Sequence, residues 1–165
     1  MLFRSPDVFW FDPGRSNYRE VGVGMGVNIL QTKRFTFSQT YDFSFASGSA
    51  AHSAKFFVPW TLFAFTPTTH WRAEAVYFPE IPLNKPARIQ HIFEREKVEY
   101  VAKHFKLGAG YGAFKFGDRD WQQKPMLTTT LRGGSLGDME FWLQRIPGNH
   151  VQVQARYKVI LKLSE

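Results

Sequence analysis

Cysteine is absent from the 165 residues of this sequence. Its absence removes disulfides, thiolate nucleophiles and cysteine-ligated metals from the interpretations of the chain. No run of about 18 apolar residues occurs either, which excludes a transmembrane helix. A transmembrane β-strand is compatible with the mean hydropathy of −0.30, because alternating strands average to a mildly polar sequence.

Signatures of metal, cofactor and catalytic sites are also missing. The five histidines lack the His-x-His and His-x-x-x-His spacings that bring two imidazoles to one metal. Ser53 follows His52, but neighbours on an extended chain point in opposite directions and do not form a nucleophile–base pair. The glycine run 108–112 lacks the spacing of a dinucleotide-binding loop. We therefore predict no metal and no cofactor, and we assign no catalytic residue.

Acidic residues are few, since 14 Asp and Glu stand against 21 Lys and Arg and the formal net charge is +7. A basic surface favours anionic partners such as small anionic solutes and lipid head groups. The charges are scattered, without a run of five or more, so no specific nucleic acid partner is predicted. A nucleic-acid-binding sheet that uses basic and aromatic side chains stays an alternative.

Alternation of apolar and polar residues with period two is the main pattern that is present, and it predicts strands. In 21–29, Val and Met alternate with Gly22, Gly24 and Gly26, and three glycines on one face predict a close neighbour there. In 34–45, Phe and Tyr alternate with small polar residues. The expected strands are 21–29, 34–45, 55–65, 70–78, 87–101, 105–116, 126–132, 137–146 and 150–163, with Val8–Phe11 as a tenth.

Three segments depart from this pattern. Pro59 cannot donate to a ladder, so it predicts a bulge, a bend or an edge strand. The alternation blurs at 94–97, where a helix is an alternative. Residues 1–5 are interpreted as a non-native leader that is neither a signal peptide nor a strand, and a signal peptide is expected to be missing from the chain. No repeat or composition shift divides residues 1–165, which predicts a single domain.

The predicted fold class is all-β: an antiparallel up-and-down meander that forms a complete or incomplete β-barrel. In a soluble barrel the apolar rows would face inward, whereas in a membrane barrel they would face lipid. About eleven residues at ~3.3 Å each, tilted by ~40°, cover roughly 28 Å, which matches a lipid-facing band of about 25 Å. Small residues on the polar faces and alternating short and long loops also favour the membrane setting.

On these features residues 21–163 resemble bacterial outer-membrane β-barrel proteins as a class. The resemblance implies a location in the bacterial outer membrane, the lipid bilayer as partner, and a role as a passive channel or as a structural or surface barrel. Such barrels usually end in an aromatic residue, whereas this chain ends in Ser164 and Glu165. The alternative from the residues themselves is a soluble β-barrel module that binds an apolar ligand inside a Phe-rich core.

Charged and amide side chains on the faces opposite the apolar rows are the candidate lumen or binding residues. In a membrane barrel they would either pair as an ionic plug or form a basic constriction that favours anions. The candidates are Arg72, Glu74, Arg88, Gln90, Glu140, Gln154, Arg156 and Lys158.

Overall fold

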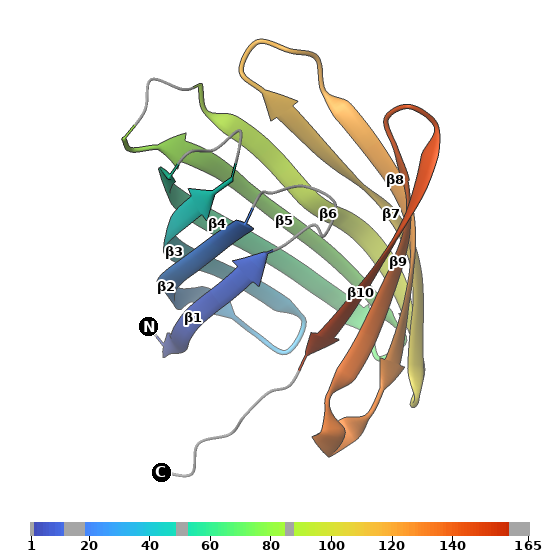
Figure 1. Cartoon of the computed structure of the whole chain (residues 1–165). Helices are drawn as coiled ribbons and strands as arrows, with labels where there is room; N and C mark the ends of the chain where they lie inside the picture. The colour runs from blue at the N-terminus through green and yellow to red at the C-terminus, as the bar shows by residue number, and fades with distance from the viewer. Residues whose placement is uncertain (1, 12–18, 49–52, 85–87, 159–165) are drawn as a thin grey trace.

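The computed structural model describes residues 2–11, 19–48, 53–84 and 88–158. It contains one antiparallel sheet of ten strands in sequence order, which confirms the predicted meander (Figure 1). The strands are β1 (Leu2–Phe11), β2 (Arg19–Gln31), β3 (Phe35–Ser47), β4 (Ala54–Thr68), β5 (Trp71–Pro82), β6 (Gln90–Val101), β7 (Phe105–Phe116), β8 (Gln122–Arg132), β9 (Asp138–Ile146) and β10 (His150–Lys158). A short 3-10 turn, Gly134–Leu136, joins β8 to β9.

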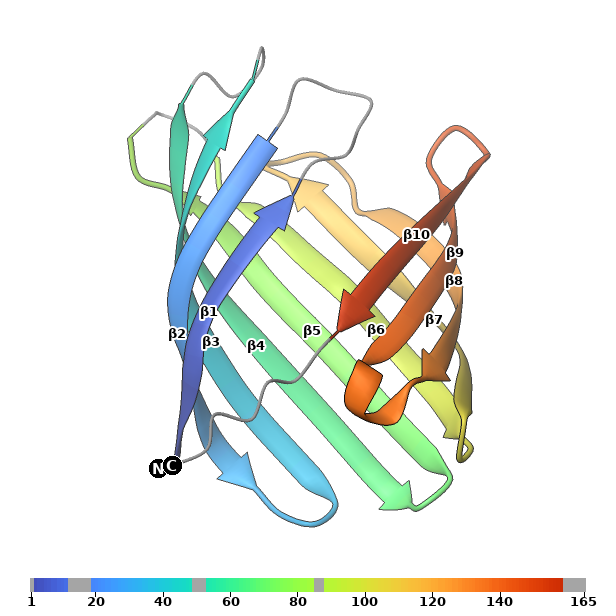
Figure 2. The same cartoon turned by 60° about the horizontal axis from the view of Figure 1, so that its bottom comes forward.

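The sheet curves round without closing. Across the described ranges every ladder joins strands that follow one another in the chain, and none joins β1 to β10. Figure 2 shows β1 and β10 on the same side of the molecule with an opening between them. The architecture is therefore an incomplete barrel.

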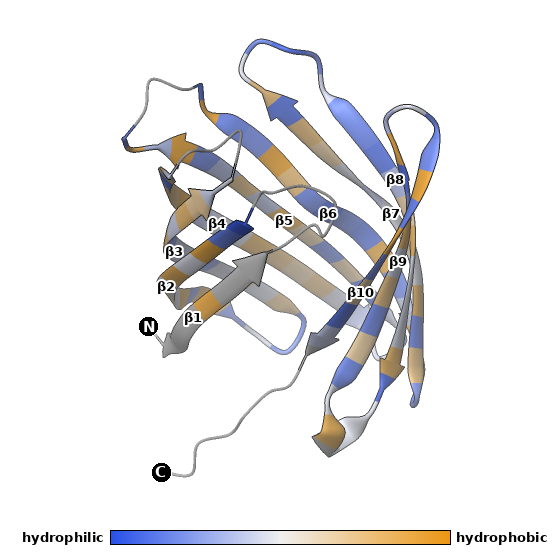
Figure 3. Ribbon diagram, in the orientation of Figure 1, coloured by the Kyte–Doolittle hydropathy of each residue, from blue (hydrophilic) through white to orange (hydrophobic). Residues whose placement is uncertain are grey.

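Burial along the strands is inverted relative to a water-soluble core. On β3, Ser38 and Ser44 are 0% and 1% exposed, whereas Phe43 and Phe45 are 52% and 48% exposed. The same order holds on β8, where Thr128 and Thr130 are buried and Leu127 and Leu131 are exposed. Figure 3 shows bands of apolar and polar residues along the coloured parts of the strands. On these strands the polar rows face the inside of the curved sheet and the apolar rows face outward.

The inner wall formed by β4 and β5 is different, because it carries large apolar side chains. A buried cluster joins Phe56 and Val58 of β4 to Val76 and Phe78 of β5. The expectation of a small, polar interior therefore fails on this wall. Residues 55–65 are apolar on both faces, so their alternation could not indicate which side chains point inward.

Of the bulge, bend or edge expected at Pro59, the bulge and the edge are wrong. β4 lies between β3 and β5, and Pro59 pairs with Tyr41 of β3. The β4–β5 ladder is interrupted at residues 58–60 and resumes in the same register, with Phe57 opposite Ile81 and Thr61 opposite Tyr77. Pro59 carries no N–H that it could donate to this ladder. The register shift of this ladder lies instead between Phe65 and Thr68.

A β-bulge on β6 explains the blurred pattern at 94–97. The β5–β6 register shifts between Val76 and Tyr77, and the β6–β7 register shifts between Phe93 and Glu96. β6 therefore carries one extra residue at Glu94–Arg95, which interrupts the alternation. The helix considered for this segment is wrong, because these residues lie within a strand.

Strand ends differ from the expected bounds in a few places. β1 confirms the tenth strand. It begins at Leu2, so the expectation that residues 1–5 are not a strand is wrong for residues 2–5. β5 runs to Pro82 and β8 starts at Gln122, so the loops expected at 79–86 and 117–125 are shorter. β10 ends at Lys158, and the expected continuation to 163 lies outside the described residues. In the part of the chain that the structure describes, no helix is long and apolar enough to cross a membrane.

Candidate functional site

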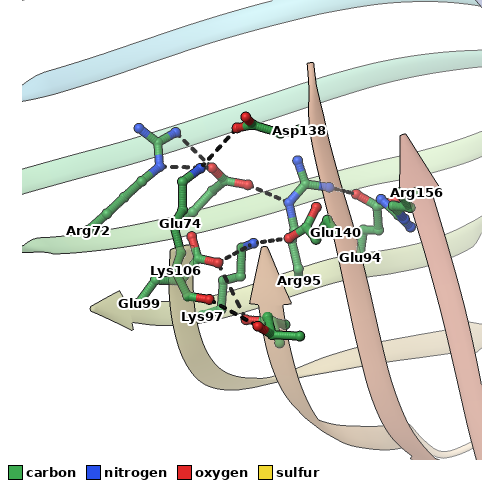
Figure 4. Close-up of polar contacts among 12 residues, drawn as sticks. Arg72, Glu74, Glu94, Arg95, Lys97, Glu99, Lys106, Asp138, Glu140 and Arg156 are labelled. Carbon is green, nitrogen blue, oxygen red and sulfur yellow. Dashed lines mark hydrogen bonds and ion pairs between the residues drawn. The ribbon is translucent and has the colours of Figure 1, made fainter. Parts of the chain in front are cut away.

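Charged side chains from five strands, β5, β6, β7, β9 and β10, converge on the inner face of the sheet (Figure 4). Glu74 on β5 accepts a hydrogen bond of 2.7 Å from Nη2 of Arg72 on the same strand. Its second oxygen accepts a hydrogen bond from Arg95 in the bulge of β6. Arg95 also donates to its neighbour Glu94. Because of the bulge, two consecutive residues of opposite charge both face the interior.

Lys97 is the most deeply buried cation of this group, with a side chain that is 4% exposed. Its ammonium group donates to Glu99 at 2.9 Å and to Glu140 of β9 at 2.5 Å. The hydroxyl of Thr128 on β8 donates to the same Glu99 oxygen at 3.4 Å. One ammonium group therefore bridges two strands that do not pair with each other in the sheet.

The buried indole ring of Trp142 is surrounded by the cations of this group. The guanidinium carbon of Arg156 on β10 lies 3.7 Å from the ring centroid, that of Arg95 lies 5.7 Å from it, and the ammonium nitrogen of Lys97 lies 5.8 Å from it. Arg156 also pairs with Glu94 at 2.8 Å. A cation above an aromatic face is stabilised more strongly when water is excluded, so the ring helps to hold buried positive charge.

We call this group the ionic cluster and define it by its paired members. It contains five basic and five acidic residues, each in at least one ion pair, so its formal charge is zero. Buried charges are tolerated when they are paired and hydrogen-bonded. The members are Arg72, Glu74, Glu94, Arg95, Lys97, Glu99, Lys106, Asp138, Glu140 and Arg156.

Glycines of β7 make room for this cluster. A Cβ atom on Gly108 would lie 2.6 Å from Cγ of Glu99, and one on Gly110 would lie 2.1 Å from the carbonyl oxygen of Glu96. On β2, a Cβ on Gly24 would overlap the Asp42 side chain. The close neighbour expected beside the glycine faces is confirmed: these strands lack side chains where inward polar groups of the next strand need the space.

A cavity of about 200 Å³ lies beside the ionic cluster, on the side of the long connections. Glu94, Trp142 and Arg156 border both the cluster and the cavity, and Gln154 also lines the cavity. A second, more open cavity of about 570 Å³ is lined by Arg88 and Gln90 and shares Phe116 with the first. The two cavities adjoin at Phe116, and we call them together the recess.

The candidate residues are only partly brought together. Arg72, Glu74, Glu140 and Arg156 belong to the ionic cluster, and Gln154 lies beside it in the first cavity. Arg88 pairs with Asp118 in an exposed position outside the cluster, and Gln90 lies next to it. Only the backbone of Lys158 is described, in register with Asp138.

Four central members of the cluster were missed: Glu94, Arg95, Lys97 and Glu99. The bulge obscured the phase of the first two. The other two had a usable signal, because Lys97 and Glu99 alternate with Val98 and Tyr100, which are exposed on the outer face. Counting back from the apolar residues at the end of the strand would have placed both charges inward.

Histidines do not gather into a site. Nδ1 of His70 lies 3.3 Å from the carbonyl oxygen of Val101, whereas Nδ1 of His91 lies 2.8 Å from the Tyr77 hydroxyl, near the other end of β5. His52, considered beside Ser53, lies outside the described residues. Within the described ranges no group of three His, Cys, Asp or Glu residues is arranged to hold a metal ion.

Fold and site together define a class of structure: an antiparallel β-meander, curved into an incomplete barrel, with outward apolar rows and a charge-balanced ionic cluster on its inner face. Comparisons with protein-family models, with curated proteins and with solved structures find no significant match to the chain.

Proposed function

We propose that this chain is a bacterial outer-membrane β-barrel protein whose interior is closed by the ionic cluster, so that it acts as a structural or surface barrel rather than as an open channel. The observation that carries the proposal is the inverted burial of β3. Ser38 and Ser44 are shielded while Phe43 and Phe45 are exposed. In water this arrangement exposes apolar area at a cost of roughly 25 cal/mol per Å², whereas hydrocarbon removes that cost.

The outward face has the dimensions of a bilayer core. Outward positions of β5 run from Trp71 to Ile81, and at ~3.3 Å per residue with a tilt of ~40° they rise about 25 Å. Aromatic pairs lie toward both ends of this band: Trp71 with Tyr100, and Phe93 with Trp121. Aromatic side chains at both interfaces are a property of membrane barrels.

A closed interior is favoured over an open pore for two reasons. First, the ionic cluster is charge-balanced and connects β5 and β6 with β9 and β10 across the inside. Secondly, the opposite wall is covered by the apolar cluster around Phe56 and Phe78. A selective pore of the basic type needs unpaired positive charge along its path, and the charges of this cluster are paired.

Site-specific labelling tests the proposal directly, because single cysteines can be placed in a chain without natural ones. Phe43→Cys and Ser44→Cys are a matched pair at nearly the same depth but on opposite faces. After refolding into phospholipid vesicles, a fluorophore on residue 43 should be quenched by lipids brominated in their acyl chains. A fluorophore on residue 44 should be quenched much less. The pair Leu127→Cys and Thr128→Cys repeats the comparison on β8.

The proposal would be contradicted by equal quenching at both members of each pair. It would also be contradicted by a folded protein that remains soluble in detergent-free buffer without vesicles. The second result would instead favour a soluble binding module. The observation behind that alternative is the apolar cluster of β4 and β5, which could contact an apolar ligand. Tighter folding with a fatty acid in plain buffer would then support it.

A further inference from the structure

Gln144 on β9 combines deep burial with an unsatisfied hydrogen-bonding group. The residue is 3% exposed, and its side-chain oxygen has no hydrogen-bond donor among the described residues. It lines the first cavity. A buried acceptor without a donor costs about 1–3 kcal/mol, so a hydrogen-bond donor that reaches Gln144 from the cavity would remove this cost.

Lys124 on β8 supplies a positive charge at the same cavity. Its ammonium group lies 4.3 Å from the ring centroid of Phe114, and it takes part in none of the ion pairs found in the described part of the chain. The other charges at the cavity, Glu94 and Arg156, neutralise each other at 2.8 Å. The cavity therefore carries one net positive charge, which favours an anionic group.

Apolar side chains form part of the remaining wall. Ile92, Phe114 and Trp142 line the cavity, and Arg156 lies over the Trp142 ring. The volume of about 200 Å³ is below the range of about 300–1,000 Å³ for pockets of drug-sized ligands. The occupant is therefore no larger than a single ring with short substituents.

From these three observations we infer that the cavity binds a small aromatic monocarboxylate that also carries a hydrogen-bond donor. The carboxylate pairs with Lys124, the donor reaches the side-chain oxygen of Gln144, and the ring packs against Phe114 and Trp142. Access is from the second cavity, where Arg88 is paired with Asp118 but Arg119 adds a further positive charge. Such a field attracts anions toward the recess.

This inference goes beyond the proposed function and does not depend on it, because the cavity lies on the inner face whichever solvent surrounds the sheet. The probe is 4-hydroxybenzoate, titrated calorimetrically into the whole chain folded in detergent micelles. We expect a dissociation constant of about 1 mM or tighter. Benzoate, which lacks the donor, and phenol, which lacks the carboxylate, should each bind about 10-fold more weakly.

Variants assign each interaction. Lys124→Met should weaken 4-hydroxybenzoate binding about 10-fold and Lys124→Arg should restore it, since the charge returns. Gln144→Leu should weaken 4-hydroxybenzoate about 5-fold and leave benzoate unchanged. Lys33→Met, an exposed lysine in the connection 32–34 at the opposite end, is the matched control and should bind as the wild type does.

No binding up to about 10 mM, or equal affinities of the wild type, Lys124→Met and Gln144→Leu for 4-hydroxybenzoate, would overturn the inference. A folded Lys124→Arg protein that fails to bind would do the same. Failure here is distinguishable from failure of the membrane proposal, because the labelling experiment reports the outer face and the titration reports the inner one.

Discussion

The ion pairs of a single lysine are expected to contribute strongly to the stability of the interior. Lys97 holds Glu99 at 2.9 Å and Glu140 at 2.5 Å while almost fully buried. Lys97→Met keeps much of the side-chain volume but leaves two carboxylates without their cation, so we expect it to lower the free energy of unfolding by about 3–5 kcal/mol. Urea unfolding in vesicles or micelles measures this loss.

The control for this change is Lys103→Met, at an exposed lysine in the connection 102–104. It should alter the free energy of unfolding by less than about 0.5 kcal/mol. Adding Glu99→Gln and Glu140→Gln to Lys97→Met should recover part of the loss, because the uncompensated charges disappear. A Lys97→Met protein as stable as Lys103→Met would show that the ion pairs do not hold the interior together.

Glu96 is an acid on the outward apolar face. Its register partners are Ala75 and the exposed Tyr111, and it lies near the middle of β6. Charges on the lipid face of a barrel are costly near the bilayer centre, less so for Glu than for the ~2–4 kcal/mol of Arg or Lys. We therefore expect Glu96→Leu to stabilise the protein by about 1–2 kcal/mol in vesicles, measured by reversible urea unfolding.

The size of this change depends on the solvent outside the sheet. Glu96 is half-buried, and one of its carboxylate oxygens is shielded without a hydrogen-bond partner among the described residues, so in water Glu96→Leu should stabilise the protein by less than about 1 kcal/mol. The neighbouring Val98→Leu keeps the outer face apolar and serves as the comparison. No stabilisation by Glu96→Leu relative to Val98→Leu would count against hydrocarbon contact at this position.

At the scale of the strand, period-two alternation was enough to predict the meander and nearly all of its elements. It succeeded on β3 because every second residue is small and polar. It failed at two kinds of place, for physical reasons. On β4 both faces are apolar, so no phase is visible. On β6 the extra residue at Glu94–Arg95 reverses the phase within one strand, and the centre of the ionic cluster was missed with it.

Deleting Glu94 should remove the bulge and test what it does. The register pairs Tyr77 with Phe93 and Val76 with Arg95, so without Glu94 the ladder becomes regular and Ile92 and Phe93 keep their faces. The ion pairs of Glu94 with Arg95 and Arg156 are lost, and we expect a loss of about 1–3 kcal/mol, measured by urea unfolding. A fluorophore on a cysteine at Phe93 should still be quenched from the lipid phase, as it is without the deletion.

Deletion of Ile89, in the connection 83–89 between β5 and β6, is the matched control, because a loop absorbs one missing residue more easily than a ladder does. It should leave the label at residue 93 in its wild-type environment. If the Glu94 deletion shields the label at residue 93 and the Ile89 deletion does not, the ladder has slipped and Glu94 is not the inserted residue of a bulge.

At the scale of the whole molecule, the open edges of β1 and β10 conflict with a bilayer, since each unpaired backbone group in hydrocarbon costs several kcal/mol. An even number of meandering strands makes the first and last antiparallel, so the two edges can pair with each other. Val8 and Val153 are both exposed. Val8 lies toward the C-terminal end of β1 and Val153 toward the N-terminal end of β10, which is the same end of the sheet because the two strands are antiparallel. We therefore expect Val8→Cys/Val153→Cys to form an intramolecular disulfide in vesicles, seen as a monomer with altered mobility on non-reducing gels.

The geometry of a disulfide makes this outcome informative, because its Cα atoms must lie within about 4.4–6.8 Å of each other. Val8→Cys/Leu143→Cys is the control, since Leu143 pairs with Val153 and lies one strand further from β1; it should not cross-link. If Val8→Cys/Val153→Cys instead links two chains, the edges of neighbouring copies pair and the barrel is built from more than one molecule. If neither link forms in vesicles, both edges face lipid unpaired, and the energetic basis for placing this sheet in a membrane is lost.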